Sequence, residues 1–162
     1  MNDTTTPPAG QFPITVNAQY IKDFSFENPN APRSLMTNGT PPNVEVNINV
    51  EARPLADDTY EVTLKVNAEA KTAEISCFVV ELAYACIMTL NGFSEDQLQP
   101  VLMIEGPRLL FPFARQIIAD ATREGGFPPL LINPIDFAAM YQQNVLQNSQ
   151  AAALADDQAG NA

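Results

Sequence analysis

The sequence predicts an α+β domain, in which one antiparallel sheet has helices packed on one face. Alternating apolar and polar residues dominate the first half of the chain, and helical spacing dominates the second. One segment stands out, because residues 75–90 (ISCFVVELAYACIMTL) are apolar at both odd and even positions and are interrupted only by Glu81. Successive side chains of a strand point to opposite faces, so this strand is expected to need cover on both, from another subunit or an apolar partner.

Three earlier segments are predicted to be strands with one apolar side. In residues 14–27, one face carries Ile14, Val16, Ala18, Tyr20, Phe24 and Phe26, with Lys22 as its polar exception, and Ile21 is the apolar exception on the other face. Residues 43–51 and 60–70 repeat the alternation, and the turn residues 56–58 (ADD) separate them. The short links after the second and third strands predict antiparallel hairpins.

Helical signals follow the fourth strand. Ser94 and Gln97 fit a capping box, and Pro100 is expected to limit or bend the helix that they begin. Pro107 can open a second helix, which Gly125 and Gly126 end. The apolar, proline-rich residues 127–134 are predicted to be neither helix nor ordinary loop, and Asn133 is expected to cap a last helix.

Composition divides the 162 residues into three parts. Residues 1–12 are polar and contain prolines, which predicts a disordered head, and residues 13–146 hold the strand and helix patterns of one domain. Residues 147–162 consist mainly of Ala, Gln, Asn and Asp, which predicts a flexible tail.

The charge and hydropathy of the chain exclude several classes of partner. A formal net charge of -11 repels phosphate, so nucleic acids and anionic membranes are poor partners, whereas basic proteins suit this surface. No apolar run is long enough to span a bilayer, and the first residues do not resemble a signal peptide. A cytoplasmic protein without direct membrane insertion is therefore expected.

The sequence lacks the usual residues of catalysis. It contains no histidine, no glycine-rich phosphate-binding loop and only two cysteines, Cys77 and Cys86, so we expect no enzyme, no metal site and no cofactor. The two cysteines are nine positions apart on one predicted strand, hence on opposite faces, and a disulfide between them is not expected. The adjacent acids Asp57 and Asp58 fit a turn better than a metal site.

Two surfaces admit both an ordinary and a functional interpretation. The polar sides of the strands carry many acids with Lys65 as their only balancing cation, which fits either a solvated sheet face or a docking surface for a basic protein. Aromatic residues such as Phe127 and Tyr141 fit either core packing or a groove for extended apolar peptide.

Four long runs, in order, resemble the bacterial export chaperone family SecB. They are YIKDFSFENPNAP (20–32), LADDTYEVTLKV (55–66), LFPFAR (110–115) and FPPLLINPIDFAAMY (127–141). The resemblance spans about residues 18–143, and within the family the sequence is most similar to the alphaproteobacterial type. It implies a four-stranded antiparallel sheet with two main helices packed on one face, assembled into a homotetramer that is a dimer of dimers. It also implies an ATP-independent chaperone that holds unfolded precursor proteins and delivers them to the translocation ATPase SecA.

The resemblance also implies roles for particular positions. The SecA-docking positions fall on Asp23, Glu27, Val79 and Glu81. The client groove points to Phe26, Phe127, Leu130, Ile132, Phe137 and Tyr141, and the tetramer interface to Val80, Leu82 and Tyr84. Two alternatives stay open, namely a SecB-like chaperone for a cytosolic partner such as an antitoxin, and a small-molecule carrier that uses the same apolar cavity.

Overall fold

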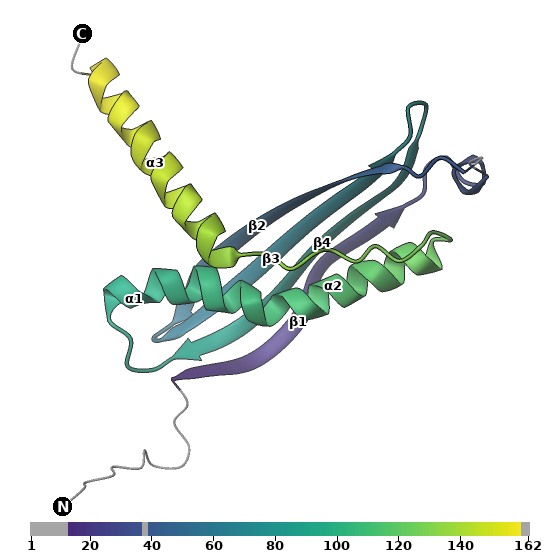
Figure 1. The fold of residues 1–162 in the computed structure, drawn as a ribbon. Coiled ribbons are helices and arrows are strands. Elements are labelled where there is room, and N and C mark those ends of the chain that lie inside the picture. The colour runs from purple at the N-terminus through teal and green to yellow at the C-terminus, as the bar shows by residue number, and fades with distance from the viewer. Residues whose placement is uncertain (1–12, 37–38, 160–162) are drawn as a thin grey trace, which may run out of the picture.

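The computed structural model of the protein describes residues 13–36 and 39–159, so the expected disordered head lies outside the described residues. Its four strands, β1 (Ile14–Glu27), β2 (Asn43–Ala56), β3 (Thr59–Lys71) and β4 (Ser76–Leu90), form one antiparallel sheet. The order across the sheet is β1-β4-β3-β2 (Figure 1). The predicted fold class is confirmed, and the strand that is apolar on both sides, β4, lies inside the sheet.

The two predicted hairpins are present. Asp57 and Asp58 link β2 to β3, and Asp58 adopts a positive φ of 55°, which aspartate tolerates in tight turns. Residues 72–75 link β3 to β4. The strand β1 instead pairs with β4, and the chain reaches β2 at the opposite edge through a short 3-10 helix, η1 (Arg33–Leu35).

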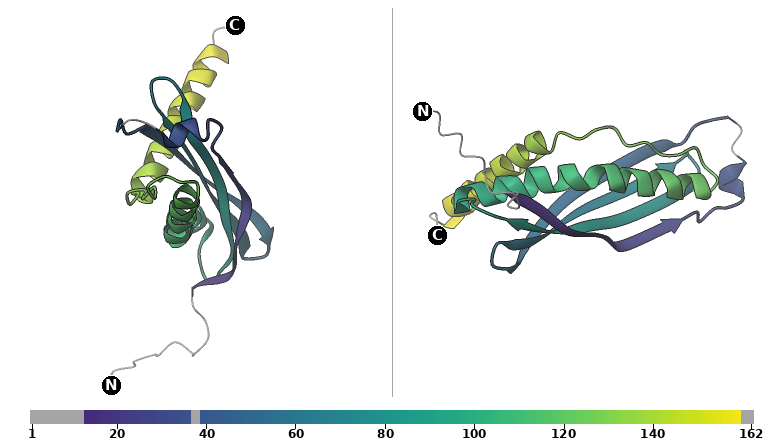
Figure 2. Two further views of the ribbon diagram at one scale, coloured as in Figure 1. Left: turned by 90° about the vertical axis from the view of Figure 1, so that its right-hand side faces the viewer. Right: turned by 90° about the horizontal axis from the view of Figure 1, so that it is seen from below.

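The sheet has two different faces. The even positions of β2, β3 and β4 form what we call the helix face, and their core includes Val62, Leu64 and Val66, which are fully buried. The odd positions form the opposite surface, which we call the open face (Figure 2). The alternation predicted for residues 43–51 and 60–70 is confirmed, because each even residue of β2 from Val44 to Pro54 lies opposite an even residue of β3.

The alternation predicted for β1 is wrong between residues 18 and 21. Single extra residues, Asn17 and Lys22, interrupt the pairing of β1 with β4. A bulge of one residue reverses the faces of all following side chains, so the two bulges cancel outside this stretch. Tyr20 therefore lies on the open face, opposite Ala85, and Ile21 lies on the helix face, opposite Tyr84.

A long helical rod covers one face of the sheet. It consists of α1 (Glu95–Pro100), a π-helical turn η2 (Val101–Glu105) and α2 (Gly106–Glu124), and Figure 2 shows α2 lying along the sheet. The capping box is confirmed, since the backbone N–H of Ser94 donates to Gln97 Oε1 at 3.1 Å. Gly106 allows close approach to the sheet, because a Cβ there would lie 2.9 Å from a methyl group of Val62.

The last helix, α3 (Phe137–Ala159), differs from the prediction at both ends. Asn133 does not cap it. The carboxylate of Asp136 does, because Oδ1 accepts the N–H of Ala139 at 3.0 Å. The flexible tail predicted from residue 147 is helical as far as Ala159, since a run of Ala, Gln and Leu extends a helix that is already nucleated.

In α3, Phe137 is buried and residues 138–141 are half-buried, and the rest of the helix projects away from the sheet (Figure 1). Among the helices in the described part of the chain, none is both long and apolar enough to cross a bilayer.

Candidate binding surfaces

An apolar pocket lies on the helix face at the end of the sheet where α2 stops. Its volume is about 470 Å³. The crossover segment, residues 126–136, forms one wall and the connection from β1 to β2 forms the other, with Phe78 and Val44 of the sheet between them. The lining residues are Ser34, Leu35, Gly39, Thr40, Pro41, Pro42, Val44, Cys77, Phe78, Gly126, Phe127, Pro128, Pro129 and Leu130.

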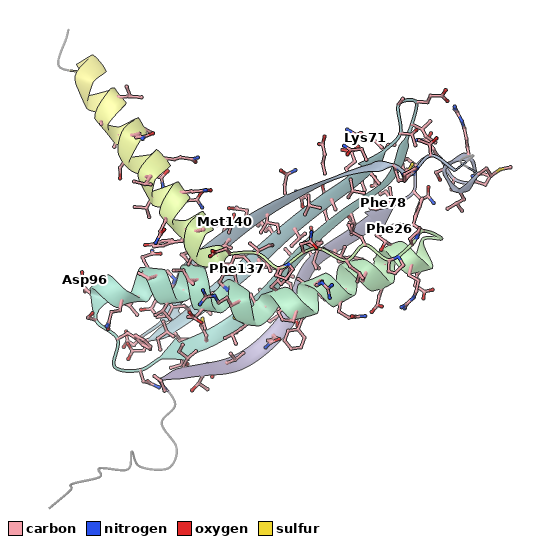
Figure 3. All side chains as sticks on the ribbon, in the orientation of Figure 1. Phe26, Lys71, Phe78, Asp96, Phe137 and Met140 are labelled. Carbon is pink, nitrogen blue, oxygen red and sulfur yellow. The ribbon has the colours of Figure 1, made fainter. Side chains whose placement is uncertain are left out.

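Three aromatic rings join the pocket to the core. The ring of Phe78 lies 5.9 Å from that of Phe26 and 5.0 Å from that of Phe127, between centroids. Figure 3 shows Phe26 and Phe78 together at this end of the sheet. Gly125 makes room for them, because a Cβ there would lie 2.3 Å from the Phe26 ring. The pocket therefore has a rigid aromatic floor on the side of β1 and β4.

Two polar side chains of α2 hold the crossover segment in place. The hydroxyl of Thr122, fully buried, accepts the N–H of Leu130 at 2.9 Å and donates to the Ile118 carbonyl at 3.0 Å. The guanidinium of Arg115 donates from Nε to the Ile132 carbonyl at 2.9 Å. These bonds satisfy backbone groups of the crossover segment, which is itself neither helix nor strand.

The six predicted groove residues do not all lie at this pocket. Phe127 and Leu130 line it, Phe26 packs directly behind it, and Tyr141 is half-buried outside it. Ile132 and Phe137 were predicted to line the groove, but they lie in the core, with exposed fractions of 7% and 1%. Phe137 packs edge-on against Phe111 at 6.0 Å, away from Phe26 and Phe78 (Figure 3).

The prediction missed the opposite wall of the pocket. Leu35, Pro41 and Pro42 lie more than eighty residues from the crossover segment in sequence, and no periodic pattern links the two. The prolines at 41 and 42 were the one available signal, because they mark another segment that is neither helix nor strand.

The four residues predicted for SecA docking share the open face. Glu27 lies opposite Val79, Glu81 lies opposite Ser25, and Asp23 lies opposite Ala83 on the same pair of strands. All three acids are exposed and Val79 is half-buried. We call these four residues the acidic patch. It spans about 13 Å along β1, from the usual rise per strand residue.

The other acids of the open face are mostly ion-paired. Glu51 pairs with Lys65 at 2.7 Å and Glu69 with Lys71 at 3.0 Å. Within residues 13–36 and 39–159, no cation lies within 4.0 Å of the carboxylates of the acidic patch. Negative charge is therefore least balanced at the acidic patch, where a basic partner gains most.

The sequence had suggested that Lys65 is the only cation on this face, but the structure places others there. Lys22 of β1 and Arg53 of β2 both reach Glu61 Oε1, at 2.7 and 2.8 Å, and the Tyr20 hydroxyl donates to Glu61 Oε2. We call these four residues the Glu61 cluster. Glu61 is 5% exposed. The hydrogen bonds from Arg53, Lys22 and Tyr20 lower the pKa of Glu61 to about 2. Burial and the adjacent carboxylate raise the pKa of Tyr20 to about 12.

The three residues predicted for the tetramer interface are buried within one chain. Val80 and Leu82 lie in the core on the helix face, and Tyr84 is only 8% exposed. Their side chains lie on the face that α2 covers, so little of their surface is exposed in the single chain. Tyr84 does reach the surface indirectly, since its ring stacks on Phe113 at 6.2 Å.

An exposed apolar strip runs between β1 and α2 beside Tyr84. It consists of Ile21, Phe24, Leu109 and Phe113. Ile21 pairs with Tyr84 across the sheet, Phe24 pairs with Leu82, and Leu109 precedes Phe113 by one helical turn. Four large apolar side chains in one area form the kind of surface that a second protein usually covers.

The described residues offer little reactive chemistry. Cys77 and Cys86 are free and buried, and burial raises the pKa of the Cys86 thiol to about 11. In the part of the chain that the structure describes, no group of three or more Asp, Glu or Cys residues could hold a metal ion. The arrangement supports binding through apolar area and charge.

Comparison with known proteins identifies the family. A sequence model described as preprotein translocase subunit SecB matches residues 8–148. The chain belongs to the SecB family. The protein-export protein SecB of Azorhizobium caulinodans is 53% identical over 148 residues, which cover 91% of this chain and 89% of the relative. SecB of Nitrobacter winogradskyi is 51% identical over 152 residues, covering 93% and 96%. The family predicted from the four sequence runs is confirmed.

A solved structure shares the SecB fold. It is a Mycobacterium tuberculosis SecB-like chaperone in complex with a peptide from an antitoxin. The TM-score is 0.63 at 12% sequence identity, over 75% of this chain and 90% of that chain. At this identity the likeness shows the fold alone.

Proposed function

We propose that the chain is a cytoplasmic, ATP-independent export chaperone that holds unfolded precursor proteins and delivers them to SecA. The observation that carries the proposal is the placement of two different binding surfaces on opposite faces of one sheet. The apolar pocket opens on the helix face, and the acidic patch lies on the open face. A client and SecA therefore need not compete for the same surface. The proposal includes no catalytic step and no cofactor.

Clients bind through extended apolar segments. The pocket is walled by Pro, Leu and Phe side chains and presents few fixed polar groups, so it selects apolar character rather than a sequence. Full burial of one Leu or Phe side chain contributes about 1.5–3 kcal/mol, which is weak for a single site. Several pockets on one assembly can engage the same unfolded chain and add avidity.

SecA docks on the acidic patch. In the described part of the chain, the three carboxylates of the acidic patch form no ion pair, and Val79 provides an apolar contact opposite Glu27 and two residues from Glu81, with Asp23 at the far end of the patch. Glu81→Lys and Asp23→Lys are expected to weaken SecA binding by at least about tenfold at low salt, because each reverses a charge at the contact. The matched control is Glu51→Lys, which makes the same charge change on the same face but outside the acidic patch.

The measurement is SecA affinity together with the affinity for an unfolded precursor. Client binding is expected to stay unchanged in all three variants, because the pocket lies on the other face. Equal SecA affinity for Glu81→Lys and Glu51→Lys would contradict docking at the acidic patch.

The same proposal includes a homotetramer built as a dimer of dimers. The exposed apolar strip supplies the surface, and Tyr84 and Leu82 act as its backing rather than as direct contacts. This role accounts for the predicted importance of positions 82 and 84 although both are buried, whereas Val80 lies opposite Phe26, outside the strip.

A lysate pull-down with the wild-type chain distinguishes this proposal from its alternatives. Many unfolded precursors are expected to be retained. A single antitoxin in their place would indicate the alternative of a chaperone for one cytosolic partner, and one co-purifying small molecule would indicate a carrier.

A further inference from the structure

The second bulge of β1 decides which side chains the acidic patch contains. Lys22 is the extra residue, and after it Asp23 and Glu27 lie on the open face while Phe24 and Phe26 lie on the helix face. Without this bulge the strand would continue its alternation from Ile21, and the two acids would point toward α2 instead. Docking by Asp23 and Glu27 therefore depends on one local irregularity of an edge strand.

The Glu61 cluster connects this bulge in β1 to β3, which lies on the other side of β4. Tyr20 and Lys22 stand on either side of Ile21, and both bond to the carboxylate of Glu61, which belongs to β3. β4 lies between β1 and β3, and on its open face Ala85 lies opposite Tyr20 while Ile87 lies opposite Glu61. The small side chain of Ala85 leaves space in which Tyr20 of β1 and Glu61 of β3 meet above β4.

The carboxylate is well placed to fix this geometry. Glu61 is nearly completely buried, and both of its oxygens are occupied, by Tyr20 on one and by Lys22 and Arg53 on the other. Arg53 comes from β2, so the cluster ties together three strands across the width of the sheet. A buried charge that is bonded on every side holds its partners in one arrangement.

We propose that Glu61 is a positioning residue for SecA docking: it holds Tyr20 and Lys22, fixes the bulge between them and so turns Asp23 and Glu27 to the open face. This inference rests on the proposed docking of SecA at the acidic patch. Glu61 itself does not touch the partner. This role also explains why a tyrosine, a lysine and an arginine gather around one carboxylate of the open face.

The test separates positioning from simple loss of charge. Glu61→Gln removes one negative charge from the open face, and Glu51→Gln removes one from the same face without touching the bulge. The double variant Glu61→Gln with Lys22→Gln removes one charge of each sign, so the net charge of the face stays as in the wild type. SecA affinity, client affinity and amide hydrogen exchange are measured for each variant.

The expected result is a fall in SecA affinity of about tenfold for Glu61→Gln and for the double variant, and of less than about twofold for Glu51→Gln. Amide exchange is expected to rise at residues 20–24 and to stay unchanged in β2, while client affinity stays as in the wild type. Wild-type SecA affinity in the double variant, or unchanged exchange at residues 20–24 in Glu61→Gln, would overturn the inference.

Three further variants keep the outcome clear. If Glu61→Gln unfolds, Tyr20→Phe takes its place, because it removes only the hydroxyl group that bonds to Glu61. The variant pair Asp23→Asn and Glu27→Gln tests the docking proposal directly. If these lose SecA binding while Glu61→Gln and Tyr20→Phe keep it, the positioning role fails and the docking patch stands. If Asp23→Asn and Glu27→Gln both bind SecA normally, the docking proposal itself fails.

Discussion

The hydroxyl of Thr122 is a single group whose removal should loosen the wall of the apolar pocket. Thr122→Val preserves the shape of the side chain and leaves the Leu130 N–H without its acceptor, which lies at 2.9 Å. The Ile118 carbonyl keeps its place in the helix, so the main loss is one partly buried donor. An unsatisfied donor of this kind costs about 1–3 kcal/mol, and we expect a value near the lower end because Leu130 is half-buried.

The assay is urea unfolding at equal protein concentration, combined with amide hydrogen exchange at Leu130. Ser149→Ala is the matched control, because it also removes a hydroxyl that bonds to a helix carbonyl, but at an exposed site in α3. Its cost is expected to stay below about 0.5 kcal/mol. Equal unfolding free energies for Thr122→Val and Ser149→Ala would refute the idea that Thr122 holds the crossover segment.

Two other predictions follow from the burial and charges of the chain. Phe113→Asp is expected to dissociate the assembly, because it places a charge in the exposed apolar strip without opening the core; light scattering that still shows a tetramer at low micromolar concentration would exclude this strip as the interface. The pKa of Glu61 falls from its usual 4.5 to about 2 on folding, so its stabilising contribution is complete above about pH 4.5 and is lost as pH falls toward 2. The unfolding free energy of Glu61→Gln should therefore change less than that of the wild type over this pH window, and parallel curves would contradict the cluster.

Local patterns were enough to predict the sheet. Alternation located three of the strands, because each has one face that must be apolar to cover the core, and a run that is apolar at both odd and even positions located the fourth, β4. The bulges of β1 were only partly visible. Ile21 and Lys22 broke the apolar-polar alternation of the sequence at the second bulge. The first bulge, at Asn17, left that alternation unbroken in the sequence.

The pocket and the exposed apolar strip could not be predicted in the same way, because they depend on contacts distant in sequence. Phe137 is the type of residue expected in an apolar groove, but Phe111 of α2 covers it. Val80 and Leu82 likewise are apolar residues whose cover comes from their own chain. The acidic patch was predictable as a set, since both bulges precede Asp23 and the alternation beyond them is regular.

The central claim, that unfolded clients bind in the apolar pocket, is tested most directly by two neighbouring leucines. Leu130 lines the pocket, whereas Leu131 lies on the same crossover segment and points to solvent, 55% exposed. Leu130→Asp and Leu131→Asp therefore make the same chemical change on either side of one wall. We predict that affinity for a labelled unfolded precursor falls by about tenfold or more in Leu130→Asp and stays near wild type in Leu131→Asp, from the apolar area lost. Equal affinities in the two variants would contradict the account.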